Sequence, residues 1–250
     1  MSTPRTKSLG RAVAVLREVA ARPSSSASEL ARASGLPRST VARTLRTLAD
    51  AGIVEESAGG WVVGRELIRL ARDADPDRRL LDAARPVLER LRDATAESAL
   101  LAVPRGRPAM EIVLQVDPAR LVGVAGWVGV DVPLHASAAG KLILADLGDA
   151  ELEAWLARTR LARFTRATIG SREALRAELA RVRGRGWADL VDELEEGHVS
   201  LAVPVRGADG ALVAALGLSG PKFRLERARR RELLPRLRRA AAEVERASAI

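Results

Sequence analysis

Basic and hydroxyl side chains recur at helical spacing in residues 38–51, and DNA recognition uses these two kinds of group. At about 100° per residue they share one face of the expected helix. Guanidinium and hydroxyl groups bond phosphate oxygens, and an Arg can also bond the edge of guanine through two hydrogen bonds. The pattern predicts a helix that contacts DNA, and an ordinary solvated face is the alternative. The residues on this face are Ser39, Thr40, Arg43, Arg46 and Thr47.

His135 and an acidic run at residues 189–196 are the other candidates for chemistry. His135 could be a ligand, a general base or a pH sensor, but its apolar neighbours favour a buried histidine bonded to the backbone. The acidic run could hold a metal ion together with His135, yet it lacks a regular ligand spacing and is typical of a solvated turn. His198 follows Gly197, and an exposed loop is expected there.

The chain lacks the sequence patterns of common catalytic sites. Lys141 follows Gly140, but the phosphate-loop pattern G-x-x-x-x-G-K-[ST] is missing, as is a G-x-S-x-G elbow. There is no Cys, which excludes disulfides, thiol catalysis and Cys-based metal sites. We therefore predict no catalytic residue, no metal site and no cofactor, and a protein that is not an enzyme.

Positive charge is concentrated at the two ends of the chain, whose formal net charge is +9. Residues 1–72 carry 12 Arg and Lys against 6 Asp and Glu, whereas residues 73–223 carry 20 against 22. This suits a DNA-binding domain joined to a domain with another task, while the Arg-rich end at residues 224–250 is typical of a solvated helix face. Without a membrane-spanning apolar run or a signal-peptide core, we expect a cytoplasmic protein with no membrane contact.

Three helices and a hairpin are predicted in the basic N-terminal part. Residues 8–22 form the first helix, and Ser28 is the expected N-cap of the second, over residues 29–34. Gly35 and Pro37 separate it from the basic helix. Strands at 53–56 and 61–63 flank a Ser-Ala-Gly-Gly turn. This order is a winged helix-turn-helix, which places a helix in the major groove of DNA.

The rest of the chain mixes helices and strands without strict βαβ alternation, which indicates an α+β fold. A helix over residues 65–74 ends at a break that contains Asp and Pro. We therefore predict two domains, residues 1–72, which include the start of this helix, and residues 73–250. The other expected helices cover residues 78–96, 137–147, 149–158, 171–185 and 225–247, and the expected strands cover residues 99–103, 110–116, 120–126, 187–191, 200–205 and 211–219.

The chain resembles the IclR family of bacterial transcription regulators over almost its whole length. The resemblance rests on three segments in order, SELARASGLPRSTVARTLRTLADAGIV, PLHASAAGKLILADL and GWADLVDELEEGHVSLAVPVRGADGALVAALGLSGP. It implies an N-terminal winged helix-turn-helix domain, a linker helix and a C-terminal GAF-like effector-binding domain with a central antiparallel sheet. Family members bind operator DNA as dimers or dimers of dimers, and a small organic or aromatic acid bound in the C-terminal domain changes the DNA-bound state.

The resemblance also implies the residues of two sites. The implied DNA contacts are Arg38, Ser39, Thr40 and Arg43, with the wing near Gly59 and Gly60 at the DNA backbone. The implied effector pocket contains Ser137, Ala138, Ala139, Leu190, Ser200 and Ser219, and His135 beside this turn is counted with it. Leu190 and Ser200 stand where some members have an acidic residue and a cysteine, so one polar partner is lost and a hydroxyl replaces a thiol.

The predicted function is a sequence-specific transcription regulator whose operator binding is modulated by a small organic acid. Its predicted partners are double-stranded operator DNA, the acid and further copies of the chain, as a homodimer or a dimer of dimers. Two alternatives remain: an architectural DNA binder whose C-terminal domain only dimerises, and an enzyme with its active site in the sheet domain. Melting temperatures measured with a set of organic acids separate them, because a ligand of the native state raises the melting temperature.

Overall fold

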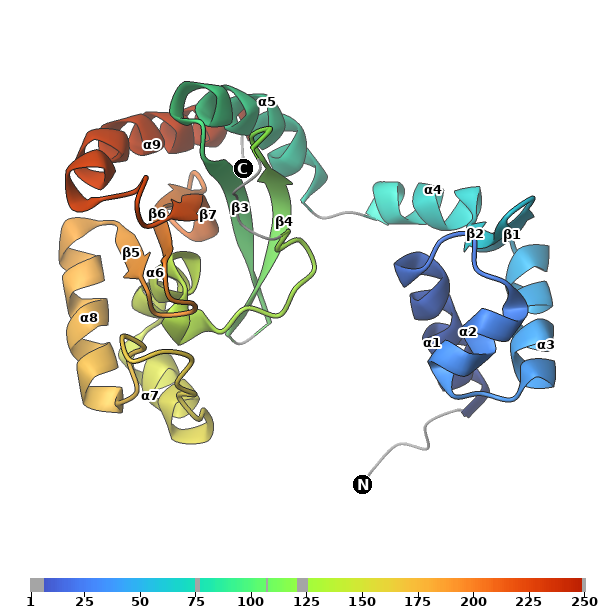
Figure 1. Ribbon diagram of the computed structural model, residues 1–250. Coiled ribbons are helices and arrows are strands. Elements are labelled where there is room, and N and C mark those ends of the chain that lie inside the picture. Colours follow the sequence, from blue (N-terminus) through green and yellow to red (C-terminus); the bar gives the residue numbers. More distant parts are fainter. Residues whose placement is uncertain (1–6, 75–76, 107, 121–125, 249–250) are drawn as a thin grey trace. The chain divides into compact units, whose positions relative to one another are not determined.

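The computed structural model describes residues 7–74, 77–106, 108–120 and 126–248. Contacts divide the chain into two compact units, Met1–Arg78 and Arg79–Ile250. This division lies after Arg78, whereas the sequence placed the domain boundary after residue 72. Figure 1 shows the elements of both units, which are described separately below.

The N-terminal unit is a three-helix core with a two-stranded wing. Its elements are α1 (Lys7–Ala21), α2 (Ala27–Ser34), α3 (Arg38–Asp50), β1 (Val54–Ser57), β2 (Gly60–Val63) and α4 (Arg65–Ala74). The strands pair antiparallel, with Ser57 opposite Gly60. One cluster of buried side chains joins the three helices and the wing: Val15, Val19, Leu30, Ala31, Val41, Leu45 and Val54. The predicted winged helix-turn-helix is confirmed.

The start of α2 differs from the prediction, because Ser26 and not Ser28 is its N-cap. Ser26 Oγ accepts a hydrogen bond from the backbone N of Glu29 at 3.3 Å, and Glu29 Oε2 accepts one from the backbone N of Ser26 at 2.8 Å. This reciprocal capping box requires the serine three residues before the glutamate, which selects Ser26. The helix ends at Gly35, whose φ of +66° is the left-handed conformation expected of a C-terminal cap.

The C-terminal unit is built on a five-stranded antiparallel sheet with the order β4-β3-β7-β6-β5. The strands are β3 (Ser98–Arg105), β4 (Ala109–Val116), β5 (Ala188–Val191), β6 (His198–Arg206) and β7 (Leu212–Pro221). His198 is therefore the first residue of a sheet strand, which corrects the expectation of an exposed loop. The strand predicted at 120–126 falls largely on residues 121–125, outside the described residues.

Helices cover both faces of this sheet (Figure 1). One face packs against α5 (Arg78–Thr95) and α9 (Arg227–Ser248), and the other against α6 (Ala138–Asp146), α7 (Asp149–Arg158) and α8 (Arg172–Arg185). Successive residues of β3 alternate between the two cores, since Leu101 packs with α5 and α9 and Leu100 packs with the α6 side. The α+β class and the central antiparallel sheet are confirmed.

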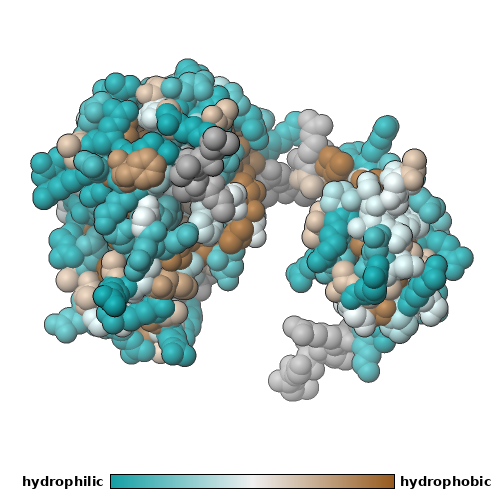
Figure 2. Space-filling model, viewed as in Figure 1, coloured by the Kyte–Doolittle hydropathy of each residue, from teal (hydrophilic) through white to brown (hydrophobic). Residues whose placement is uncertain are grey.

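Both units present a hydrophilic surface in the view of Figure 2, with apolar residues scattered between polar ones. Within the described parts of the chain, no helix combines the length and the hydropathy that crossing a bilayer requires.

The capping box gives a stability test of the N-terminal unit. Ser26→Ala removes the side chain that caps α2, so the free energy of unfolding should fall by about 1 kcal/mol in urea denaturation followed by circular dichroism. Ser28→Ala is the matched control, because Ser28 lies inside the helix and should change stability by less than about 0.5 kcal/mol. The opposite ranking of the two variants would show that the cap is assigned to the wrong serine.

Candidate DNA-binding face and ligand cavity

The solvent-facing side of α3 carries the side chains predicted to contact DNA. Val41 and Leu45 anchor the helix in the core, and both are fully buried. On the other side Arg38, Ser39, Arg43 and Arg46 are exposed, with Thr40 half-buried beside them. Among the described residues no side chain pairs with the three guanidinium groups. They are thus available for phosphates or base edges.

The start of α3 also leaves backbone donors open. Its N-cap is Pro37, and no side chain caps the helix, in contrast to the capping box of α2. The first N–H groups of a helix have no partner within the helix, and the helix dipole makes this end favourable for an anion. Free N–H groups and the Arg38 guanidinium therefore occur at the same helix end, which is a suitable arrangement for a DNA phosphate.

A groove between α1 and α3 adds a residue that the sequence analysis missed. Arg11 of α1 is exposed and lines this groove together with Thr40, Arg43 and Thr47 of α3. The sequence analysis predicted a helix over residues 8–22 without a role at DNA, and the missed signal is a basic residue away from its buried positions, Val15 and Val19. Arg11 brings a second cation to the side of the unit that carries Arg43.

The wing turn brings backbone rather than long side chains to the surface. Gly59 is exposed, and Gly60 has a φ of +130°, which only glycine adopts without strain. A Cβ at Gly60 would also lie 2.6 Å from the carbonyl oxygen of Ser25. Glycine is thus required by the turn itself, and any role of these two residues at DNA remains a prediction.

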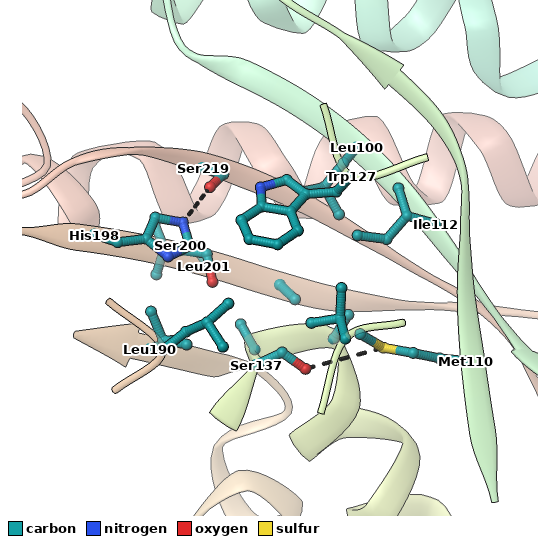
Figure 3. Close-up of a pocket in the computed structure, with 15 residues that line it drawn as sticks. Leu100, Met110, Ile112, Trp127, Ser137, Leu190, His198, Ser200, Leu201 and Ser219 are labelled. Atoms are coloured by element: carbon teal, nitrogen blue, oxygen red, sulfur yellow. Dashed lines mark hydrogen bonds between the residues drawn. The ribbon is translucent and has the colours of Figure 1, made fainter. Parts of the chain in front are cut away.

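The C-terminal unit contains a cavity between its sheet and the start of α6 (Figure 3). About 420 Å³ of its space is free of protein atoms, part of it open to solvent. Most of the lining is apolar and includes Leu100, Met110, Ile112, Trp127, Val132, Leu190, Leu194 and Leu201. An apolar lining with a few polar groups is typical of a small-molecule site.

Six of the seven residues predicted for the effector pocket line this cavity: Ser137, Ala138, Ala139, Leu190, Ser200 and Ser219. His135 does not line it. The side chain is 3% exposed, its Nε2 lies 2.9 Å from the carbonyl oxygen of Ala162, and its ring packs beside Phe164. The short 3₁₀ turn Leu134–Ala136 directs it there, so His135 is the backbone-bonded histidine that its apolar neighbours favoured.

The start of α6 supplies polar groups to the cavity. Ser137 caps the helix, and its Oγ accepts a hydrogen bond from the backbone N of Gly140 at 3.1 Å. The N–H groups of Ala138 and Ala139 then have no partner within the helix, and both residues line the cavity. Gly140 is required here, because a Cβ would lie 2.4 Å from the backbone of Leu134. This helix end can bind an anion.

His198, Ser219 and Trp127 form a second polar region of the cavity, as Figure 3 shows. His198 Nε2 and Ser219 Oγ are 2.7 Å apart, and the imidazole stacks on the Trp127 ring with centroids 6.2 Å apart. The other ring nitrogen, Nδ1, is buried and has no hydrogen-bond partner among the described residues. Burial lowers the pKa of His198 below its usual value near 6.5, an effect that the charge of Glu195 opposes.

The sequence contained a signal for His198 that the analysis did not use. His198 and Ser200 are two residues apart on β6, and side chains at this spacing share one face of a strand. Extending the strand by two residues would have placed the imidazole beside Ser200. Trp127 had no such signal, because it lies on an irregular segment.

A buried ion pair connects α6 with the loop after β5. Lys141 is 1% exposed, and its Nζ donates hydrogen bonds to the Glu193 carboxylate and, at 3.0 Å, to the carbonyl oxygen of Asp189. Burial raises the pKa of Glu193, which the charge of Lys141 opposes. Because Leu194 follows Glu193 and lines the cavity, the pair holds one wall of the cavity against the helix that forms another.

Three of the five acidic side chains in the run at residues 189–196 form such pairs. Asp189 pairs with Arg185, Asp192 with Lys222 and Glu193 with Lys141. Among the described residues, no three His, Cys, Asp or Glu side chains are grouped so that they could hold a metal ion. The run therefore fastens the end of β5 and the following loop to neighbouring elements.

A winged helix-turn-helix with an open basic face, followed by a domain with a largely apolar cavity, is the organisation of a DNA-binding transcription regulator. Comparison with known families supports this class. Residues 8–58 match the IclR helix-turn-helix domain, and residues 76–246 match the bacterial transcriptional regulator IclR C-terminal domain. The chain belongs to the IclR family of bacterial transcriptional regulators.

Individual relatives agree over nearly the full length of the chain. The acetate operon repressor of Salmonella typhimurium strain LT2 is 32% identical over 246 residues, which are 97% of this chain and 90% of the repressor. The crystal structure of Thermotoga maritima IclR has a TM-score of 0.83 at 25% identity and covers 98% of this chain and 100% of its own. An IclR homolog from Microbacterium hydrocarbonoxydans, complexed with 4-hydroxybenzoate, has a TM-score of 0.83 at 28% identity and covers 96% and 98%.

The exposed face of α3 gives a test of DNA reading. Arg43→Ala should weaken specific operator binding by about 1–3 kcal/mol if the guanidinium contacts a base, and it should leave the folded structure intact because the side chain is exposed. The measurement is fluorescence anisotropy with operator and with random DNA. Arg17→Ala is the matched control, because Arg17 is also exposed but does not line the groove. Wild-type affinity of Arg43→Ala would exclude Arg43 from the interface.

Proposed function

We propose that this protein is a sequence-specific regulator whose affinity for operator DNA changes when a small organic acid binds in the cavity of the C-terminal domain. The observation that carries the proposal is the open N-terminus of α6 at an otherwise largely apolar cavity. Ala138 and Ala139 offer two N–H groups there, and a helix N-terminus favours a carboxylate. The apolar walls, with Trp127 among them, favour an acid with an aromatic or similarly apolar body.

Two further observations support this ligand class. The Microbacterium hydrocarbonoxydans homolog, whose fold is closely similar, is complexed with 4-hydroxybenzoate, an aromatic acid. In this chain Ser200 lines the cavity as well, so its hydroxyl can bond the far side of a bound acid. Leu190 is fully buried in the lining and offers no polar partner, so selectivity rests on the hydroxyls, His198 and the helix end.

Among the described lining residues, only Ser219 and His198 resemble a catalytic pair. This pair gives little support to the enzyme alternative. In Ser–His catalysis a third group orients the imidazole through its other nitrogen. Here Nδ1 of His198 has no such partner among the described residues, and Ser219 is 1% exposed. The architectural alternative leaves a cavity with convergent polar groups unexplained.

The test of the whole proposal is genome-wide mapping of bound DNA in cells with and without candidate acids. A regulator of this kind should occupy a small set of sites that share one motif, and an acid should change their occupancy. Binding without a shared motif, at occupancy that no acid alters, would favour the architectural alternative.

We expect at least a dimer, because two DNA-binding units roughly double the contacts that one unit makes. Exposed apolar side chains on α1 and α4 are available for pairing: Leu9, Val13, Ile68 and Leu70. Light scattering should show a dimer or a tetramer, and the operator should be pseudo-palindromic with half-sites about 34 Å apart or a multiple of this. A monomer both free and on DNA would contradict the prediction.

The cavity gives a prediction on ligand binding, with 4-hydroxybenzoate as the first probe. Ala138→Leu fills the helix start and should abolish binding, while operator affinity without ligand stays near wild type. Ser200→Ala should weaken binding by about 1 kcal/mol, the usual net value of one hydrogen bond. Ala150→Leu is the matched control, because Ala150 is exposed on α7. Titration calorimetry measures all three.

The same titration, repeated on operator-bound protein, tests regulation. Coupling is reciprocal, so the factor by which the acid changes operator affinity must equal the factor by which operator changes acid affinity. Equal acid affinities in the free and operator-bound protein would show that the cavity does not control DNA affinity. Unchanged binding by Ala138→Leu would show that the acid binds elsewhere.

A further inference from the structure

The described side chains that line the cavity carry no permanent charge. None of the fifteen described residues that line it is Asp, Glu, Lys or Arg. An acid that enters brings a negative charge into a mostly apolar site, which is unfavourable unless a partner offsets it. The N-terminus of α6 contributes only about half an elementary charge. Among these lining residues, His198 is the one that can become positive near neutral pH.

The imidazole of His198 is held in a fixed position but is incompletely bonded. Its Nε2 bonds Ser219 Oγ at 2.7 Å, and Trp127 stacks on the ring. Nδ1 is buried without a partner among the described residues. A neutral imidazole has one donor and one acceptor nitrogen, so either tautomer leaves one hydrogen-bonding position unused. An unsatisfied buried ring nitrogen is costly unless something else in the site meets it.

We propose that an organic acid enters this cavity together with one proton, which His198 takes up, so that an imidazolium inside the cavity offsets the charge of the carboxylate. This inference rests on the proposed assignment of the cavity to an organic acid. In the charged ring Nε2–H donates to Ser219 Oγ, and the carboxylate of the acid occupies the cavity that His198 lines, where its charge acts on the ring. The proton comes from solvent, and no other bond is made or broken.

The charged groups near His198 are mostly paired within the described residues, and Glu195 is the exception. Glu195, on the preceding loop, is the carboxylate whose charge acts on the ring. Asp192 donates its backbone N–H to the His198 carbonyl oxygen, and its carboxylate pairs with Lys222, which follows the residue opposite His198 in β7.

The other neighbouring charges are also paired or absent. Glu97, next to Gly220 of β7, pairs with Arg224, and Glu193 pairs with Lys141. The sequence neighbours of Trp127, Gly126 and Val128, carry no charge. These pairs carry little net charge, so an incoming carboxylate is the main new influence on the ring.

The expected pH dependence follows from the direction of each pKa. In the free protein burial holds the pKa of His198 below its usual value, and a bound carboxylate raises it. At a pH above the pKa of His198 in the complex, the ring is neutral with and without acid. At a pH below its pKa in the free protein, the ring is charged with and without acid. Between these values the affinity for the acid rises about tenfold for each unit by which the pH falls, because one proton is taken up.

The experiment uses the full-length protein and two probes, benzoate and 4-hydroxybenzoate. The chain has two histidines, so its histidine NMR spectrum is simple, and His135 serves as an internal reference. Titration of the protein with and without saturating acid should show a higher pKa for His198 in the complex. Calorimetry in two buffers with different ionisation enthalpies should give uptake of up to one proton per bound acid, with its maximum between the two pKa values of His198.

Two matched variants separate a binding role from a structural one. His198→Gln retains a hydrogen-bonding group near Ser219 but cannot be charged, so it should bind the acids weakly and with no change in affinity from pH 8 to 6. His135→Gln should keep the wild-type pH dependence. Should either variant unfold, the wild-type NMR and calorimetry measurements still decide the question.

Three outcomes would overturn the inference: acid binding without proton uptake, a pH dependence that persists in His198→Gln, or no binding of either probe. Operator binding measured in parallel distinguishes a failure of the proposed role of His198 from a failure of the proposed regulatory function. An acid that binds without a proton and still changes operator affinity would refute only the role of His198. An acid that binds with a proton but leaves operator affinity unchanged would refute only the regulation.

Discussion

The buried pair of Lys141 and Glu193 is the interaction on which the C-terminal domain depends. Two charges removed from water are stable only if they are matched to each other and to further hydrogen bonds, so their positions tolerate little change. Lys141 belongs to the helix whose first turn lines the cavity, and Glu193 belongs to the loop that leads into β6. The pair thus fixes the distance between the two polar regions of the cavity. It is better understood as a constraint on geometry than as a source of stability.

Charge is used differently in the two units. In the N-terminal unit the guanidinium groups of α3 have no partner among the described residues, so they can bond phosphates. In the C-terminal unit the side-chain charges near the cavity are matched in pairs, such as Asp192 with Lys222 and Glu97 with Arg224. A charged ligand therefore enters a site where most of the nearby described charges are already paired, with Glu195 as the exception. This arrangement makes the cavity sensitive to one added charge.

The parts of the structure that depend on local sequence could be predicted. The cap of α6 at Ser137 and the helix-turn-helix order follow from residue types within a few positions. The second polar region of the cavity could be predicted only in part: a longer β6 places His198 beside Ser200, but its contact with Ser219 depends on the pairing of β6 with β7. His135 shows the converse error. It is two residues from Ser137, yet a single 3₁₀ turn carries it to Ala162 instead of the cavity.

The bare start of α3 has a consequence for the energetics of the N-terminal unit. A side-chain cap contributes about 1 kcal/mol to a helix, and α2 obtains this within the folded chain, whereas α3 does not. A phosphate oxygen accepting hydrogen bonds from the first N–H groups of α3 acts as a cap supplied by another molecule. In the proposed DNA complex, the first turn of α3, which has no side-chain cap in the free protein, would gain one from the nucleic acid. With that contact, part of the affinity for DNA would come from the added stability of this helix.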